Sequence, residues 1–177
     1  MNMIIAKELE DAINDQLNFE LYSGYIYLSM ATWLEEQNLR GMAHWMEVQA
    51  LEEYAHAMRF YRHIVERGGR VKMAAIKAPK TDWESPLDVW ETAYEHEKIV
   101  TERINKIGDV ADRLKDRAVQ PMLQWFYKEQ VEEEEQTMEV RDLLKMIGDS
   151  MPALFQLDGR LGARGPAASP PHESADP

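Results

Sequence analysis

The chain has 177 residues, of which 45% are hydrophobic, so it is large enough for one domain with a substantial core and too short for two. Its formal net charge of -12 makes nucleic acids and anionic membranes poor partners, and cations good ones. The absence of cysteine excludes disulfides, thiolate metal sites and thiol catalysis. Residues 1–7 lack the features of a secretion signal, and no apolar run approaches the roughly 20 residues that span a bilayer. These properties predict an acidic, helical protein of the cytoplasm.

The first half of the chain is predicted to form two long helices, because no proline precedes residue 79. We expect the first helix over residues 5–37. Asn38 then makes a tight turn and is a candidate N-cap for a second helix that runs to residue 67. The glycines at positions 68 and 69 end this helix.

The second half is predicted to form two more long helices after an extended connection. Residues 70–84 have mixed composition and indicate a long crossover. Ser85, followed by a proline and an acid three residues on, predicts the start of a helix that ends near residue 114. A fourth helix is expected over residues 116–147, with Pro121 close enough to its start to be tolerated.

A short fifth helix is predicted over residues 150–161, and residues 165–177 are expected to form a flexible tail that is rich in proline. The predicted fold class is all-α: residues 1–164 form a four-helix bundle with one long crossover between helices two and three, plus a short C-terminal helix.

Each long helix has an apolar stripe at steps of three and four residues, interrupted near its middle by metal-ligand residue types. The first stripe consists of Leu9, Ile13, Leu17, Glu20, Gly24, Tyr27, Leu28 and Ala31. The interruptions in the other three helices include Glu53, His56, Glu97, Gln130 and Glu133.

A single acid in such a stripe is most often a partly exposed side chain whose charge reaches water, and a single Glu-x-x-His is common by accident. Tyr27 alone is by default a core aromatic. Four acids in one core are different, because buried carboxylates are unfavourable without positive charge, and these stripes carry no lysine or arginine at that level. Glu53 and His56 lie three residues apart, so both can reach one ion. Oxygen donors with one imidazole suit iron or manganese, and several carboxylates favour two metals close together.

A second group of acids lies beside the first. Glu129, Glu132 and Glu133 share a helix face, where like charges repel, and Glu52 precedes Glu53. An acidic run is usually a solvated face, and Glu134 and Glu135 fit that interpretation. If Glu52 points toward the other three, the group forms a third, weaker metal position.

Residues 7–161 resemble the bacterial and archaeal non-haem ferritins. The segments that carry the resemblance are Asn18-Phe19-Glu20-Leu21-Tyr22-Ser23, Tyr25-Ile26-Tyr27-Leu28-Ser29-Met30, Glu52-Glu53-Tyr54-Ala55-His56-Ala57, Tyr94-Glu95-His96-Glu97 and Gln124-Trp125-Phe126-Tyr127-Lys128-Glu129-Gln130-Val131-Glu132-Glu133.

The resemblance implies a ferritin-like fold and a ferroxidase that oxidises Fe(II) with dioxygen or hydrogen peroxide. It also implies a hollow shell, usually of twenty-four subunits, that stores ferric mineral. In the implied site, Glu20, Glu53 and His56 hold the first iron, with Glu53 bridging. Glu97, Gln130 and Glu133 surround the second, and Tyr27 assists electron transfer. The implied third position is framed by Glu52, Glu129, Glu132 and Glu133.

Three departures from related families are informative. Gln130-x-x-Glu133 stands where symmetric di-iron bundles carry Glu-x-x-His, which argues against bacterioferritins and rubrerythrin-like peroxidases. Leu51 and Glu52 occupy the region of the haem-binding methionine, so no haem is expected. Ferritins often line a three-fold pore with acids near the start of the fourth helix, where this chain has Gln120 and Leu123. Asp112 and Asp116 are candidate substitutes there.

Two other functions remain open from the sequence. A small di-iron oxidase or peroxidase acting on an organic substrate would use the same ligands, although the Trp, Met and Phe side chains of the stripes leave little room for a substrate. A mini-ferritin that coats DNA is disfavoured by the acidic charge and the absence of a basic arm. Apolar candidates for subunit contacts are Trp33, Tyr61 and Leu154.

Overall fold

The computed structural model describes residues 4–167, within which the chain forms helices and no strands. The α-helices are α1 Lys7–Glu36, α2 Arg40–Glu66, α3 Pro86–Leu114, α4 Gln120–Ile147 and α5 Met151–Leu161. A short 3-10 helix, η1 Arg117–Val119, precedes α4. The all-α prediction, with four long helices and a short fifth, is confirmed.

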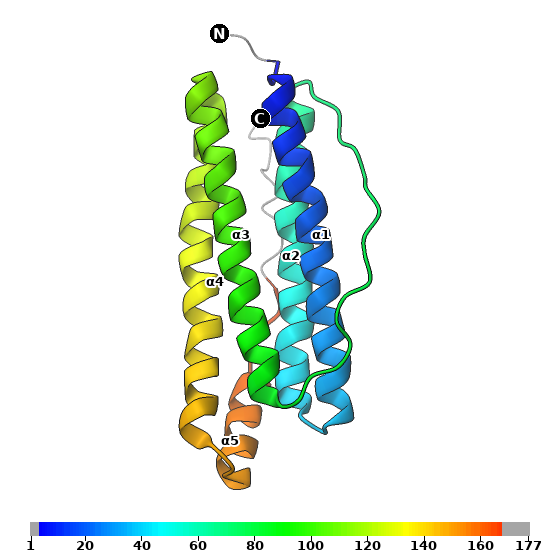
Figure 1. The fold of residues 1–177 in the computed structure, drawn as a ribbon, viewed down its shortest axis with the longest axis vertical. Coiled ribbons are helices and arrows are strands. Elements are labelled where there is room, and N and C mark those ends of the chain that lie inside the picture. The colour runs from blue at the N-terminus through cyan, green and yellow to red at the C-terminus, as the bar shows by residue number, and fades with distance from the viewer. Residues whose placement is uncertain (1–3, 168–177) are drawn as a thin grey trace, which may run out of the picture.

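The four long helices form a bundle in which α1 is antiparallel to α2, and α3 is antiparallel to α4 (Figure 1). The connection from α2 to α3 runs the length of the bundle beside α1, so α2 and α3 point the same way. The short helix α5 lies at one end of the bundle. This is the topology with a single long crossover that the proline and glycine positions predicted.

Side-chain amides on α1 hold the crossover in place. Asn14 Nδ2 donates to Arg70 O at 3.0 Å, while Asn14 Oδ1 accepts from Lys72 N at 2.6 Å. One helical turn later, Asn18 repeats the pattern with Lys72 O at 2.8 Å and Ala74 N at 2.7 Å. The two asparagines therefore give the extended crossover the backbone partners that a neighbouring strand would provide.

The predicted helix ends are partly right. Ser85 is the N-cap of α3, and its side chain accepts from Asp88 N at 3.1 Å, as expected. Asn38 does make the turn, with φ of 60°, but Leu39 is the N-cap of α2 and no side chain of the turn caps it. Asp158 on α5 caps this helix instead, since its carboxylate accepts from Met42 N at 2.8 Å. Asp116 caps η1, so α4 begins four residues later than predicted, at Gln120.

The apolar core consists of two clusters of buried side chains, one toward each end of the bundle. One gathers around Tyr27, Met46 and Trp90, and the other around Leu17, Phe60 and Phe126. The polar members of the helix stripes lie between them. The bundle therefore has a buried polar layer at mid-height.

One expectation about burial is wrong. Leu28, which the first stripe included, is 47% exposed. Consecutive residues of an α-helix point about 100° apart, so Leu28 points away from the core that buries Tyr27. Trp33, Tyr61 and Leu154, the candidates for subunit contacts, are partly buried and pack against the core clusters.

Residues 165–167 have no regular secondary structure, and residues 168–177 of the predicted tail lie outside the described part of the chain. Within residues 4–167, no helix is both long enough and apolar enough to cross a membrane.

Candidate metal centre

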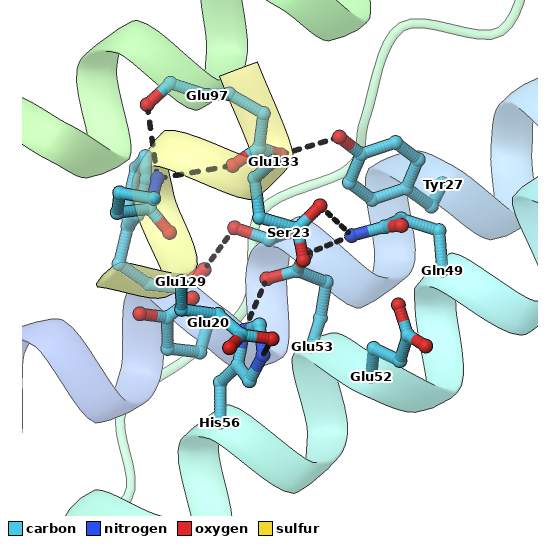
Figure 2. Close-up of polar contacts among 12 residues, drawn as sticks. Glu20, Ser23, Tyr27, Gln49, Glu52, Glu53, His56, Glu97, Glu129 and Glu133 are labelled. Atoms are coloured by element: carbon cyan, nitrogen blue, oxygen red, sulfur yellow. Dashed lines mark hydrogen bonds and ion pairs between the residues drawn. The ribbon is translucent and has the colours of Figure 1, made fainter. Parts of the chain in front are cut away.

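The polar layer contains four carboxylates, one from each long helix, that are almost completely buried. Their exposed fractions are 0% for Glu20, 1% for Glu53, 1% for Glu97 and 3% for Glu133. Figure 2 shows these side chains pointing into the space between the helices. The four carboxylates predicted from the helix stripes therefore lie together in the interior of the bundle.

Glu20, Glu53 and His56 form the tightest group, with one potential ligand atom from each lying within 4.8 Å of the others. His56 Nδ1 lies 3.6 Å from Glu53 Oε2. Two atoms that share one ion at about 2.1 Å lie about 3.0–4.2 Å apart, so this separation fits a common ion better than a hydrogen bond.

The other imidazole nitrogen of His56 faces α4. Nε2 lies 3.7 Å from Glu129 Oε1, and Glu129, Glu133 and His56 form a second group of potential ligands. If Nδ1 binds an ion with Glu53, Nε2 carries the proton and points to Glu129. A carboxylate in that position fixes the ring and its tautomer.

Two glutamines support the carboxylates, and the sequence interpretation assigned neither to the site. Gln16 Nε2 donates to Glu20 Oε1 at 2.7 Å. Gln49 Nε2 donates to Glu53 Oε1 at 2.9 Å and to Glu133 Oε2 at 2.8 Å (Figure 2). Gln49 precedes Glu53 by four residues and so shares its helix face, and that spacing was the available signal.

Glu97 is linked to Tyr27 and Gln130. The Tyr27 hydroxyl donates a hydrogen bond to Glu97 Oε1 (Figure 2). Gln130 Nε2 lies 3.3 Å from Glu97 Oε2 and 3.3 Å from Thr101 Oγ1. Tyr27 is fully buried, so its phenol is a fixed neighbour of the carboxylate.

The acids proposed for a third position are not all together. Glu129 and Glu133 lie near each other, as described above. Glu132 is exposed and lies 3.3 Å from Lys128 Nζ. Glu52 is partly buried and forms an ion pair with Arg164, a residue beyond α5 that the sequence interpretation did not assign to the site. No helical periodicity connects Arg164 with the stripes.

Burial dominates the electrostatics of this layer. It raises the pKa of Glu20 and of Glu133 well above the usual range, with help from neighbouring carboxylates, and raises the pKa of Glu97 to about 8. The pKa of Glu53 is lowered, because the neighbouring His56 imidazole and the hydrogen bond from Gln49 outweigh the effect of burial. The pKa of His56 is raised, since Glu129 and Glu53 outweigh its burial.

Two carboxylate oxygens in the layer, Glu20 Oε2 and Glu53 Oε2, are buried and make no hydrogen bond within the described residues. A buried acceptor without a partner is unfavourable by about 1–3 kcal/mol. Both residues belong to the group with His56. A cation between them would satisfy both, so the residues fit a metal ion.

The residues considered for a pore differ in burial and in partners. Leu123 is fully buried in the core and cannot line a pore. Asp116 accepts two hydrogen bonds from Arg67, at 3.1 and 2.8 Å, and Asp112 lies 3.8 Å from Arg117 Nη1.

An all-α bundle with one long crossover and a buried layer of carboxylates and one histidine defines the ferritin-like class. The Ferritin-like domain family matches residues 10–147. A bacterial non-heme ferritin of Bacteroides fragilis is 38% identical over 91% of this chain and 100% of its own length. One from Staphylococcus saprophyticus is 37% identical over 91% and 96%. The chain belongs to the non-haem ferritin family, and this membership supports iron binding and iron storage.

Solved structures agree with this placement. An open-pore ferritin of the archaeon Archaeoglobus fulgidus has a TM-score of 0.91 and 42% identity, covering 93% of this chain and 100% of that one. A closed form of that ferritin, engineered by mutagenesis, also has a TM-score of 0.91.

Proposed function

We propose that this chain is a ferroxidase subunit that oxidises Fe(II) to Fe(III) at a pair of iron positions inside its own bundle and stores the ferric product in a hollow shell. The observation that carries the proposal is the buried carboxylate layer with two unpartnered oxygens on Glu20 and Glu53. Such a layer is unfavourable without cations, so it favours the binding of iron ions, with which the proposed reaction begins.

In the first iron position, Glu20, Glu53 and His56 Nδ1 are the ligands. Glu97, Gln130 and Glu133 surround the second. Glu53 is the bridging ligand, in keeping with its position beside Glu20 and its link through Gln49 to Glu133. Gln130 presents its amide nitrogen to Glu97, so its side chain turns over when its oxygen binds iron.

The proposed reaction follows from the ligand charges. Anionic oxygen ligands stabilise Fe(III) more than Fe(II), so they favour loss of one electron from each iron. Two Fe(II) ions together give two electrons to dioxygen, which leaves as hydrogen peroxide after taking up two protons. Peroxide is the alternative oxidant, and its reduction yields water. Tyr27, hydrogen-bonded to Glu97, is the neighbouring side chain that assists electron transfer.

Glu129, Glu133 and Glu52 form the proposed third iron position, with Glu132 as an outer ligand that reaches it only by leaving Lys128. This position adjoins the pair because Glu133 belongs to both. An iron ion at the third position could therefore move to or from the pair through Glu133.

Storage requires assembly, and we propose a hollow shell, usually of twenty-four subunits in this family. Exposed apolar side chains are present on α1 and α2, including Tyr25 at 49%, Leu51 at 61% and Tyr54 at 54%. They are candidate subunit contacts beside Trp33, Tyr61 and Leu154. The Archaeoglobus relative has an open-pore shell, and an open shell would supply iron without acidic pores.

A groove between α3 and α4 favours the second candidate function, a di-iron oxidase acting on an organic substrate. Its volume is about 660 Å³, and its lining includes Tyr94, Thr101, Gln130 and Met138. A ligand in the groove would contact Gln130 at the edge of the proposed pair. Storage remains the first candidate, because the family and its structural relatives are ferritins.

The test of the site is the variant Glu53→Ala, with Glu47→Ala as control because Glu47 is exposed on the same helix. Stopped-flow absorbance after mixing Fe(II) with aerated protein measures the formation of Fe(III). We expect Glu53→Ala to lose fast oxidation while circular dichroism shows an intact bundle, and Glu47→Ala to react like the unmodified protein. Equal rates in both variants would show that the pair is assigned to the wrong residues.

A further inference from the structure

Arg164 brings a positive charge from the C-terminal end of the described chain to the edge of the metal centre. Its guanidinium pairs with the Glu52 carboxylate, and Nη2 also donates to Gln49 Oε1 at 2.9 Å. Nη1 donates to Trp45 O at 3.2 Å, and the guanidinium lies 4.0 Å from the centroid of the Trp45 ring. Only 15% of the Arg164 side chain is exposed, so this is a built contact rather than a loose surface pair.

The docking of α5 sets this position. Asp158 accepts from Met42 N at 2.8 Å, and Gly41 lets the two backbones meet, because a Cβ there would lie 1.8 Å from Asp158 O. The Arg164 carbonyl lies 3.0 Å from His44 Nε2. These contacts attach the end of α5 to the first two turns of α2. The arginine side chain then extends along α2 to Gln49 and Glu52.

Glu52 is one of the carboxylates of the proposed third iron position, yet its negative charge is already paired with the Arg164 guanidinium. A guanidinium stays protonated in proteins, so it cannot give up this carboxylate by losing its charge. An iron ion that uses Glu52 therefore has to displace the guanidinium or share the carboxylate with it.

We propose that Arg164 is a positioning residue that keeps the third iron position weak by holding Glu52 in an ion pair. Iron at that position stays exchangeable, which suits passage between the pair and the mineral. This inference rests on the proposed function, because it requires that the third position binds metal. It adds a competitor for that metal within the chain itself.

The experiment is a calorimetric titration of the metal-free, full-length assembled protein with Co(II), which binds without being oxidised. Visible absorption of the Co(II) complex is recorded in parallel. The variant is Arg164→Gln. Arg160→Gln is the matched control, because it also removes one arginine charge, four residues earlier, while Arg160 pairs with Glu139 on α4 at 2.9 Å.

We expect the third binding step to tighten about tenfold in Arg164→Gln, since releasing a charge-assisted contact is worth roughly that factor. Arg160→Gln should bind like the unmodified protein, and Arg164→Lys should lie between, because lysine keeps the charge without the fork geometry. In the Glu52→Gln background, Arg164→Gln should have no further effect on the third step. That double-mutant comparison separates competition for Glu52 from a general loss of packing.

An unchanged or weaker third step in Arg164→Gln, relative to Arg160→Gln, would overturn the inference. So would an equal tightening that persists in the Glu52→Gln background. If the unmodified protein binds no Co(II) at the pair, the proposed function itself fails. The two failures are therefore distinguishable in one set of titrations.

Discussion

Gln49 joins α2 to α4 through Glu133, whose Oε2 accepts from Gln49 Nε2 at 2.8 Å. The same amide nitrogen donates to Glu53 at 2.9 Å, so one side chain holds two carboxylates of the proposed pair. Its carbonyl oxygen accepts from Arg164, which fixes the orientation of the amide.

Replacing Gln49 with leucine should destabilise the metal-free protein by about 1–3 kcal/mol, because two buried carboxylate oxygens lose their donor. Metal ions would give those oxygens new partners, so the loss should shrink once Co(II) is bound. Thermal unfolding with and without Co(II) checks this. An equal loss in both states would show that Gln49 serves packing alone.

The pKa of Glu97, raised by burial to about 8, predicts a pH dependence for the metal-free protein. Between about pH 4 and 8 the folded state keeps a proton that the unfolded chain has released, so the free energy of unfolding falls as pH rises. Glu97→Gln removes this titration. Relative to the unmodified protein, the variant should gain about 1 kcal/mol or more between pH 5 and pH 8.

Denaturant unfolding at a series of pH values measures that difference. Glu95→Gln is the control, because Glu95 lies on the same helix with a side chain that is 64% exposed. Parallel pH profiles for Glu97→Gln and the unmodified protein would contradict the burial argument.

Tyr27→Phe tests the role of the phenol beside Glu97. Phenylalanine keeps the ring in the core and removes only the hydroxyl that donates to Glu97. We expect Co(II) binding to persist while Fe(II) oxidation slows about tenfold, equivalent to about 1.4 kcal/mol in the barrier. Tyr25→Phe, at an exposed position on α1, is the matched control. Unchanged oxidation in Tyr27→Phe would remove Tyr27 from the proposed mechanism.

Gly41→Ala should detach α5, because the new Cβ would meet the Asp158 backbone at 1.8 Å. Faster proteolysis within residues 148–164 and a lower melting temperature are the expected readouts. Gly159→Ala is the control, since a Cβ there meets no heavy atom within 4 Å and alanine favours a helix by up to about 1 kcal/mol. Equal protease resistance of the two variants would contradict the docking contact.

The part of the site that obeys helix periodicity was predictable from the sequence. Glu20, Glu53, Glu97 and Glu133 recur on apolar stripes, and the structure buries all of them in one layer. The fold was predictable as well, because prolines and glycines mark the ends of the long periodic segments.

Contacts between distant elements were not predictable. Nothing near Asn38 indicates that Asp158, far along the chain, caps α2. Arg164 likewise follows a short helix whose docking depends on the close approach at Gly41. Leu28 shows the limit of the stripes. It directly follows buried Tyr27 on the helix, yet its side chain points about 100° away and is exposed.

The central claim, that the chain oxidises and stores iron, is tested most directly by size-exclusion chromatography with iron detection after Fe(II) is added in air to the metal-free protein. We predict that iron co-elutes with a particle many times larger than one chain. Its amount should far exceed the roughly three ions per chain that the site carboxylates can ligate. Iron limited to that stoichiometry in a small oligomer would contradict storage, and would favour the di-iron oxidase instead.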